Sequence, residues 1–295
     1  MALGSSHVTG SGVASGTADA FIPEIWSDEI IAAYENSLVL KPLVRAMSMV
    51  GKKGDTIHVP KPTRGTANAK VAETQVTLNA PATSTLDIVI DRHFEYSTLI
   101  EDITDVQALN SLRRFYTEDA GYQLAKQVDT DLVAEGANFT AQRQFSGGGL
   151  AAAAGTADAA FTDAGLRAAI QILDDNDVPM TDRRFVISPA LKNTLLGISG
   201  YVSTDFVTGK PVESGVVGNL YGVELFVTTN LPTENTDEKG ALLFHKDAIV
   251  MVEQVGIRTQ TQYKLEYTGD LMVSDTIYGT SIYRPEAGVR VYGTV

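Results

Sequence analysis

From Glu101 to Asn138 the chain reads EDITDVQALNSLRRFYTEDAGYQLAKQVDTDLVAEGAN, and this stretch decides its fold. Its apolar residues recur at every fourth position without an intervening proline, which predicts one amphipathic helix over 101–138. The apolar stripe consists of Leu112, Tyr116, Ala120, Leu124, Val128 and Leu132, widened by Leu109, Phe115 and Val133. At 1.5 Å per residue the helix would be roughly 50 Å long, well beyond an average helix. This length favours a thin, flat subunit, and the alternative is a long core helix of an ordinary α/β protein.

Composition places the chain among folded proteins that use no cysteine. Its 295 residues are 44% hydrophobic, which is enough for a sizeable core and about two domains of ordinary size. Because cysteine is absent, disulfides, thiolate nucleophiles and cysteine-bound metals are excluded. No apolar run approaches the roughly 18 residues that span a bilayer, and the N-terminus lacks the pattern of a signal peptide. We expect a soluble protein without membrane contact, stabilised by packing and assembly.

The order of elements indicates an α+β fold. Residues 1–20 are almost all small or polar, which predicts a mobile arm, and a short amphipathic helix should follow from Pro23 to about Lys41. Residues 52–98 change to a period of two around 55–60 and 85–91, which predicts a hairpin with a long, core-poor excursion. Such a hairpin is marginal in water alone, so we expect it to lie on a partner surface.

The remaining elements are shorter. Residues 139–162 are rich in glycine and alanine and predict a loop or joint. A helix capped by Asp163 should end at 174–179, followed by a buried strand at 184–189 and a further helix from Pro189. Later strands are predicted at 223–227, 241–244, 248–252 and in the closing run 277–291.

The charges are unevenly distributed along the chain. The net charge is −13, which argues against wrapping nucleic acid, because that requires a basic stripe. Residues 52–71 carry five basic side chains against one acidic (+4), whereas residues 101–138 carry eight acidic against three basic (−5). A basic arm and an acidic rod predict that neighbouring copies dock in register, and the alternative is that both are merely solvated faces. The candidate inter-subunit contacts are Lys52, Lys53, Lys61, Arg64, Lys70, Glu118, Asp119, Asp129, Asp131 and Glu135.

No constellation of residues indicates catalysis. The four histidines (His7, His58, His93 and His245) have no ligand spacing. The acidic run 174–177 is followed by Pro179 and Met180 where a calcium loop would continue, so it predicts a helix end. No phosphate-binding loop or nucleophile elbow occurs. We therefore predict no catalytic, cofactor-binding or metal-binding residue and no enzyme activity. A hydrolase with paired carboxylates stays as an alternative, because such groups meet only in the fold.

Three passages carry a resemblance to a known family. They are LDDNDVP (173–179) followed by RRFVISP (183–189), GVELFVTTNLP (222–232), and YGTSIYRPEAGVRV (278–291). In this order they resemble the major capsid proteins of tailed double-stranded DNA bacteriophages, which have the Hong Kong 97-type fold. The resemblance covers the chain from Ala20 to Val295.

The resemblance implies a division of the chain into parts. Residues 1–51 would be the N-terminal arm and short helix, and 52–98 the extended hairpin loop. Residues 99–164 would form the peripheral domain with its spine helix, and 165–270 mainly the axial domain. Residues 271–295 would return to the peripheral domain.

It also implies a function and partners. The protein would be a structural coat protein that self-assembles into pentamers and hexamers of an icosahedral head, located in the virion and assembled in the host cytoplasm. The head would enclose DNA without sequence-specific binding. Expected partners are a separate scaffolding protein, a portal protein and decoration proteins. Some family members crosslink a loop lysine to a neighbour's asparagine, and Lys61 and Lys70 are placed for that. An encapsulin-type nanocompartment shell, which shares the fold, is the alternative function.

Overall fold

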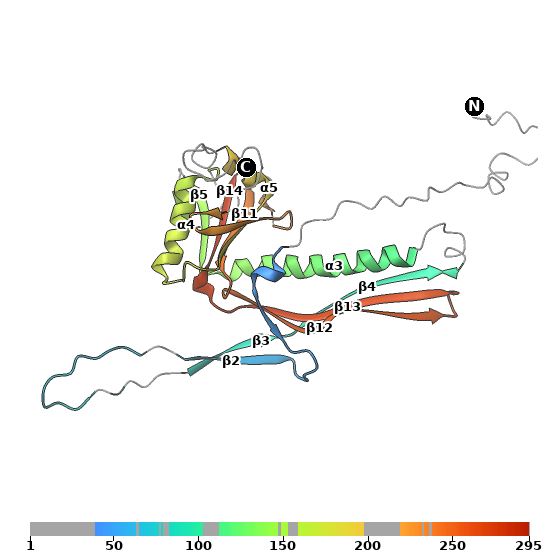
Figure 1. Ribbon diagram of the computed structural model, residues 1–295, viewed down its shortest axis with the longest axis horizontal. Helices are drawn as coiled ribbons and strands as arrows, with labels where there is room; N and C mark the ends of the chain where they lie inside the picture. The colour runs from blue at the N-terminus through green and yellow to red at the C-terminus, as the bar shows by residue number, and fades with distance from the viewer. Residues whose placement is uncertain are drawn as a thin grey trace, which may run out of the picture.

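The computed structural model describes residues 39–62, 65–76, 78, 83–102, 112–146, 149–152, 159–197, 219–231, 233–235 and 238–294. Their strands and helices form two lobes and a projecting hairpin (Figure 1). We call the lobe built on the long helix α3 the spine lobe, and the lobe built around α4 the α4 lobe. The predicted α+β class is confirmed. The predicted N-terminal arm and the helix from Pro23 lie outside the described residues.

The predicted long helix is α3, Leu112–Glu135, which continues into a short 3-10 turn at Gly136–Asn138. Its apolar stripe faces inward as expected, since Ala120, Leu124 and Leu132 are almost fully buried. The predicted start at Glu101 is wrong. Residues Arg92–Glu101 form strand β4, which stays paired with its neighbour as far as Glu101. Backbone pairing therefore overrides a helical pattern at that point.

The spine lobe contains a four-stranded sheet under α3 (Figure 1). The strand order is β1 (Arg45–Ser48), β12 (Ile249–Lys264), β13 (Gly269–Ile282) and β4. Strand β12 is much longer than the predicted 248–252. Its second half is exposed and mostly polar, so it lacks the alternation of apolar and polar residues that predicts a strand.

The α4 lobe contains an eight-stranded sheet and two helices. Seven strands follow the order β6 (Gly149–Ala152), β5 (Ala141–Ser146), β14 (Gly288–Thr294), β11 (Glu238–His245), β7 (Arg183–Ile187), β9 (Val223–Val227) and β8 (Asn219–Leu220), and β10 (Thr233–Asn235) pairs with β11. The helices are α4 (Asp163–Asp175) and α5 (Pro189–Leu196). Strands β5 and β6 correct the prediction of a loop over 139–162.

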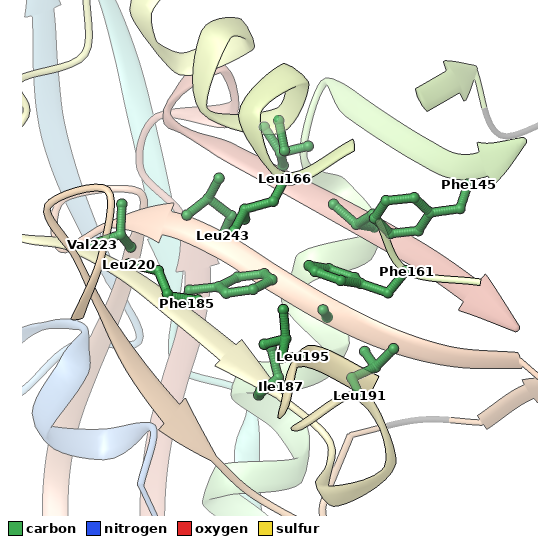
Figure 2. Close-up of a cluster of buried hydrophobic side chains, with 14 of the residues drawn as sticks. Phe145, Phe161, Leu166, Phe185, Ile187, Leu191, Leu195, Leu220, Val223 and Leu243 are labelled. Atoms are coloured by element: carbon green, nitrogen blue, oxygen red, sulfur yellow. The ribbon is translucent and has the colours of Figure 1, made fainter. Parts of the chain in front are cut away.

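Side chains from α4, α5 and the sheet meet in one core (Figure 2). Phe161 lies between Phe145 and Phe185, at ring-centroid distances of 4.7 Å and 5.9 Å. The helix α4 is capped by Thr162, whose Oγ1 accepts the amide hydrogen of Gly165 at 3.2 Å. The predicted cap, Asp163, is instead the first helical residue, where its negative charge is favourable.

Strand pairing groups the chain differently from the predicted parts. The predicted 165–270 segment contains β12, which pairs in the spine lobe, and the closing 271–295 segment contains β14, which pairs in the α4 lobe. The predicted 99–164 segment likewise contains β5, which joins the α4 lobe. The chain crosses between the lobes several times, so contiguous boundaries do not describe them. A second core containing Val128, Phe244 and Tyr278 joins α3 to both sheets.

Candidate inter-subunit surfaces

A two-stranded hairpin projects from the spine lobe, away from the end at which β12 turns into β13 (Figure 1). Strand β2 (Thr56–Pro62) pairs with β3 (Thr83–Val89) in antiparallel register, from Thr56 opposite Val89 to Pro62 opposite Thr83. Among the described residues, neither strand pairs with any other. The predicted hairpin within 52–98 is confirmed by this pairing.

The base of the hairpin is seated on the spine-lobe sheet. Ile88 and Ile90 are buried together with Met49, Val250 and Val252 in a small third core. The seat depends on a close backbone approach at Gly279 in β13. A Cβ there would collide with the backbone of Val89 and Ile90. The seat therefore fixes the direction in which the hairpin leaves the body.

The outer part of the hairpin has no comparable seat. Residues 65–76 are all exposed, and the apolar side chains of Val71, Val76 and Leu78 are 67%, 57% and 84% accessible. None of these three belongs to a hydrophobic core formed by the described part of the chain. Exposed apolar groups on a thin ribbon are typical of a surface that another polypeptide covers.

The basic candidates remain on the outside. Lys52 and Lys53 lie in the exposed turn before β2, Lys61 lies on β2, and Lys70 lies near the hairpin tip. Arg64 is outside the described residues. None of these four lysines has an ion pair within the described part of its own chain.

The acidic candidates divide into two groups. Glu118 is exposed on α3, and Asp119 is half-buried and accepts hydrogen bonds from the Tyr96 hydroxyl at 3.0 Å and from Gln123 at 3.3 Å. Asp129, Asp131 and Glu135 instead face inward. We correct the prediction for these three, because Asp129 and Glu135 are buried and Asp131, whose side chain is 13% exposed, is bound by residues of the same chain.

Asp131 and Glu135 belong to a polar network between α3 and the sheet. The Arg92 guanidinium joins them, with Nη1 at 2.8 Å from Asp131 Oδ2 and Nη2 at 3.0 Å from Glu135 Oε1. The Tyr278 hydroxyl donates to Asp131 at 2.6 Å and Thr280 donates to Glu135 at 2.8 Å. Burial raises the pKa of Tyr278 well above its usual range, and the bond to Asp131 raises it further. This network holds the helix on the sheet and leaves the carboxylates no outward role.

A second polar group, centred on the carboxylate of Asp275, joins β4, β12 and β13. Arg258 donates to both oxygens of Asp275, at 2.8 Å and 2.9 Å, and His93 Nε2 lies 3.3 Å from Oδ2. The Arg258 guanidinium holds the pKa of Asp275 below its usual value, against the opposing effect of burial, and the His93 contact also lowers it. The arrangement ties three adjacent strands together.

The described residues offer no converging chemical site. No group of three or more His, Asp and Glu side chains among them is arranged to hold a metal ion. A cleft of about 540 Å³ lies between the hairpin and the end of α4, lined in part by Lys61, Leu86, Asp177, Tyr283 and Glu286. It contains no nucleophile paired with a base. No helix in the described ranges is both long and apolar enough to cross a membrane.

The structure explains the role of Arg183, which begins the passage RRFVISP (183–189). The side chain of Arg183 is buried, and it donates to the carbonyl oxygens of Val178 and Pro179 and pairs with Asp174 at 2.7 Å. It therefore closes the turn between α4 and β7. Sequence reasoning missed the roles of Arg92 and Tyr278, because their partners on α3, Asp131 and Glu135, lie far away in the chain.

Comparison with known proteins identifies the fold. Structures similar to this chain include that of Mycobacterium phage Che8 (25% identity, 92% of this chain and 97% of that chain, TM-score 0.76). The chain is also similar to the capsid of cyanophage P-SCSP1u (20% identity, 98% of this chain and 99% of that chain, TM-score 0.76). It is similar as well to the mature capsid of bacteriophage PhiM1 (16% identity, 97% of this chain and 96% of that chain, TM-score 0.72). A comparison with curated proteins finds no match.

These similarities and the projecting hairpin define the class: the fold is that of tailed-phage capsid subunits, the Hong Kong 97-type fold. The family described as phage capsid protein matches residues 20–292. The chain therefore belongs to the phage capsid protein family.

Proposed function

We propose that this capsid protein is the major subunit of a phage head, in which pentamers and hexamers close an icosahedral shell around double-stranded DNA. The observation that supports this most directly is the hairpin, whose exposed apolar tip projects beyond its own body. Contacts between different surfaces of identical subunits generate closed rings, as such a shell requires.

The hairpin of one subunit lies on the spine lobe of the next in this proposal. The four lysines at 52, 53, 61 and 70 are exposed, and the outward acidic side chains of α3 reduce to Glu118 and Asp119. Each exposed ion pair contributes only about 0.2–1 kcal/mol, but many copies repeat the contact in a shell. Burial of Val71, Val76 and Leu78 against the neighbour supplies the apolar share.

The protein has no catalytic role in this proposal, and its location is the virion after assembly in the host cytoplasm. A separate scaffolding protein directs assembly, and portal and decoration proteins complete the head. The net charge of −13 limits adhesion to packaged DNA. We assign the parts around α3 and α4 to the peripheral and axial domains, respectively.

One set of experiments tests whether the protein assembles into particles and what those particles enclose. The protein is purified alone and with a scaffolding partner, and analysed by sedimentation and negative-stain electron microscopy. We expect large closed particles in at least one condition. A stable monomer at high concentration in both conditions would contradict the proposal. Phage-length DNA inside particles from infected cells supports a head, whereas an enzyme cargo would favour the encapsulin alternative.

The docking mode is tested by charge reversal. We expect Lys61→Glu combined with Lys70→Glu to reduce the yield of particles, because both lysines face a neighbour. Lys246→Glu, an exposed lysine of the α4 lobe, is the matched control and should leave the yield unchanged. Adding Glu118→Lys to the hairpin double variant should restore part of the yield. An unchanged yield in the hairpin double variant would refute this docking mode.

A further inference from the structure

The buried carboxylate of Asp129 has no counter-ion in the described part of the chain. It lies on α3 with 1% of its surface exposed. Its hydrogen-bond donors are the backbone N–H of Leu40 at 2.9 Å, the backbone N–H of Val39 at 3.4 Å and the Asn230 amide at 3.4 Å. A buried charge is costly unless hydrogen bonds compensate it. At Asp129 this compensation comes from two backbone N–H groups and one side-chain amide.

The donors come from separate parts of the molecule. Val39 and Leu40 begin the described chain, and Asn230 follows β9 of the α4 lobe. The side chain of Leu40 is fully buried in the core that joins the two lobes, which also contains Val128. Asp129, which lies on the spine helix, thus links that helix to the α4 lobe and to the junction formed by Val39 and Leu40.

We propose that Asp129 is a positioning residue that fixes this junction and ties it to both lobes. Hydrogen bonds between a carboxylate and backbone N–H groups are charge-assisted and directional, so they set the path of the backbone at Val39 and Leu40. The junction at Val39 and Leu40 then has the same position on every subunit. In an assembled shell, which rests on the function proposed above, this places the backbone of Val39 and Leu40 at the same point on every copy.

The test compares amide hydrogen exchange in Asp129→Asn, Asp129→Ala and the unsubstituted full-length protein. Asparagine keeps one oxygen to accept from Leu40, whereas alanine keeps none. We expect exchange of the Leu40 amide to accelerate several-fold in Asp129→Asn and about tenfold or more in Asp129→Ala. Amides of 124–133 in α3 and of 185–187 in β7 should keep their rates. Asp119→Asn, on the same helix, is the matched control and should leave Leu40 unaffected.

Two results overturn the proposal. One is an unchanged Leu40 amide in Asp129→Ala, and the other is an equal acceleration throughout α3, which would make Asp129 a general stabilising residue. If the alanine variant does not fold, the asparagine variant decides by the same measurement. Exchange is measured on unassembled protein, so this result is independent of the shell function. A broader distribution of particle diameters in Asp129→Asn would support the role in the assembled shell, and a distribution identical to that of the unsubstituted protein would overturn that role alone.

Discussion

Replacing Gly279 by alanine tests how the hairpin is held. In β13 the position of the missing Cβ is occupied by the backbone of Val89 and Ile90, at 3.1 Å from the Ile90 Cα and closer still to the Val89 carbonyl oxygen. Backbone atoms cannot rotate away as a side chain can. The added methyl group must therefore push the base of the hairpin off its seat.

The magnitude follows from the size of that seat. Overpacking a well-packed site costs about 1–3 kcal/mol. Complete loss of the burial of Ile88 and Ile90 would cost about 3–6 kcal/mol, at roughly 1.5–3 kcal/mol for each side chain. If the hairpin shifts but stays attached, the cost lies toward the lower of these two ranges. We therefore expect Gly279→Ala to lower the free energy of unfolding by about 2 kcal/mol.

The matched control is Gly121→Ala in the middle of α3. A Cβ at Gly121 meets nothing within 4 Å, and alanine is favoured over glycine in a helix by about 1 kcal/mol. The same chemical change should therefore stabilise at one position and destabilise at the other.

Urea unfolding of unassembled protein, followed by far-UV circular dichroism, measures both effects. With an m value of about 3 kcal/mol per molar, the midpoint should fall by about 0.7 M in Gly279→Ala and rise by about 0.3 M in Gly121→Ala. Gly279→Ala should also reduce particle yield, because its hairpin points in a different direction. A Gly279→Ala protein that unfolds and assembles as the original does would refute the reasoning.

Three further changes test the interior. Tyr278→Phe removes the hydroxyl bonded to Asp131 but keeps the ring stacked on Phe94, and should lower the free energy of unfolding by about 1–2 kcal/mol; no loss in urea unfolding would contradict the network. Leu132→Ala empties a fully buried site on α3 and should cost about 2–5 kcal/mol in the same assay; a loss under about 1 kcal/mol would contradict its place in the core. Because Asp275 has a lowered folded pKa, its stabilisation is present above the unfolded value of about 3.9 and is lost as pH falls through the folded value. Asp275→Asn should therefore be less stable at pH 7 and show a weaker loss of stability below about pH 4, and an acid response equal to that of the original protein would contradict it.

The sequence was sufficient where one local pattern dominated. Apolar residues at every fourth position from Ala120 to Leu132 predicted α3, because the helix face that carries them is buried against the sheet. The alternation around Thr56 and Ile88 predicted the hairpin, because its two strands follow one another in the chain and pair with each other.

The sequence was insufficient where long-range pairing decides. Glu101 belongs to the stretch whose spacing predicted a helix, but it pairs with Gly269, far away in the chain. The acidic side chains of α3 illustrate the same limit for the candidate site. Asp131 resembles Glu118 as a charge on a helix, yet Asp131 meets Arg92 and Tyr278, and only the tertiary structure reveals this. The number of charged residues in a segment does not show which of their side chains face inward.

The measurement that tests the central claim most directly is an electron cryomicroscopy map of purified particles, in which the subunit containing each hairpin is traced. We predict that residues 65–78 of one subunit lie against the spine lobe of another, with Val71, Val76 and Leu78 buried there. A map in which this segment contacts only its own subunit, or contacts solvent, would contradict the account.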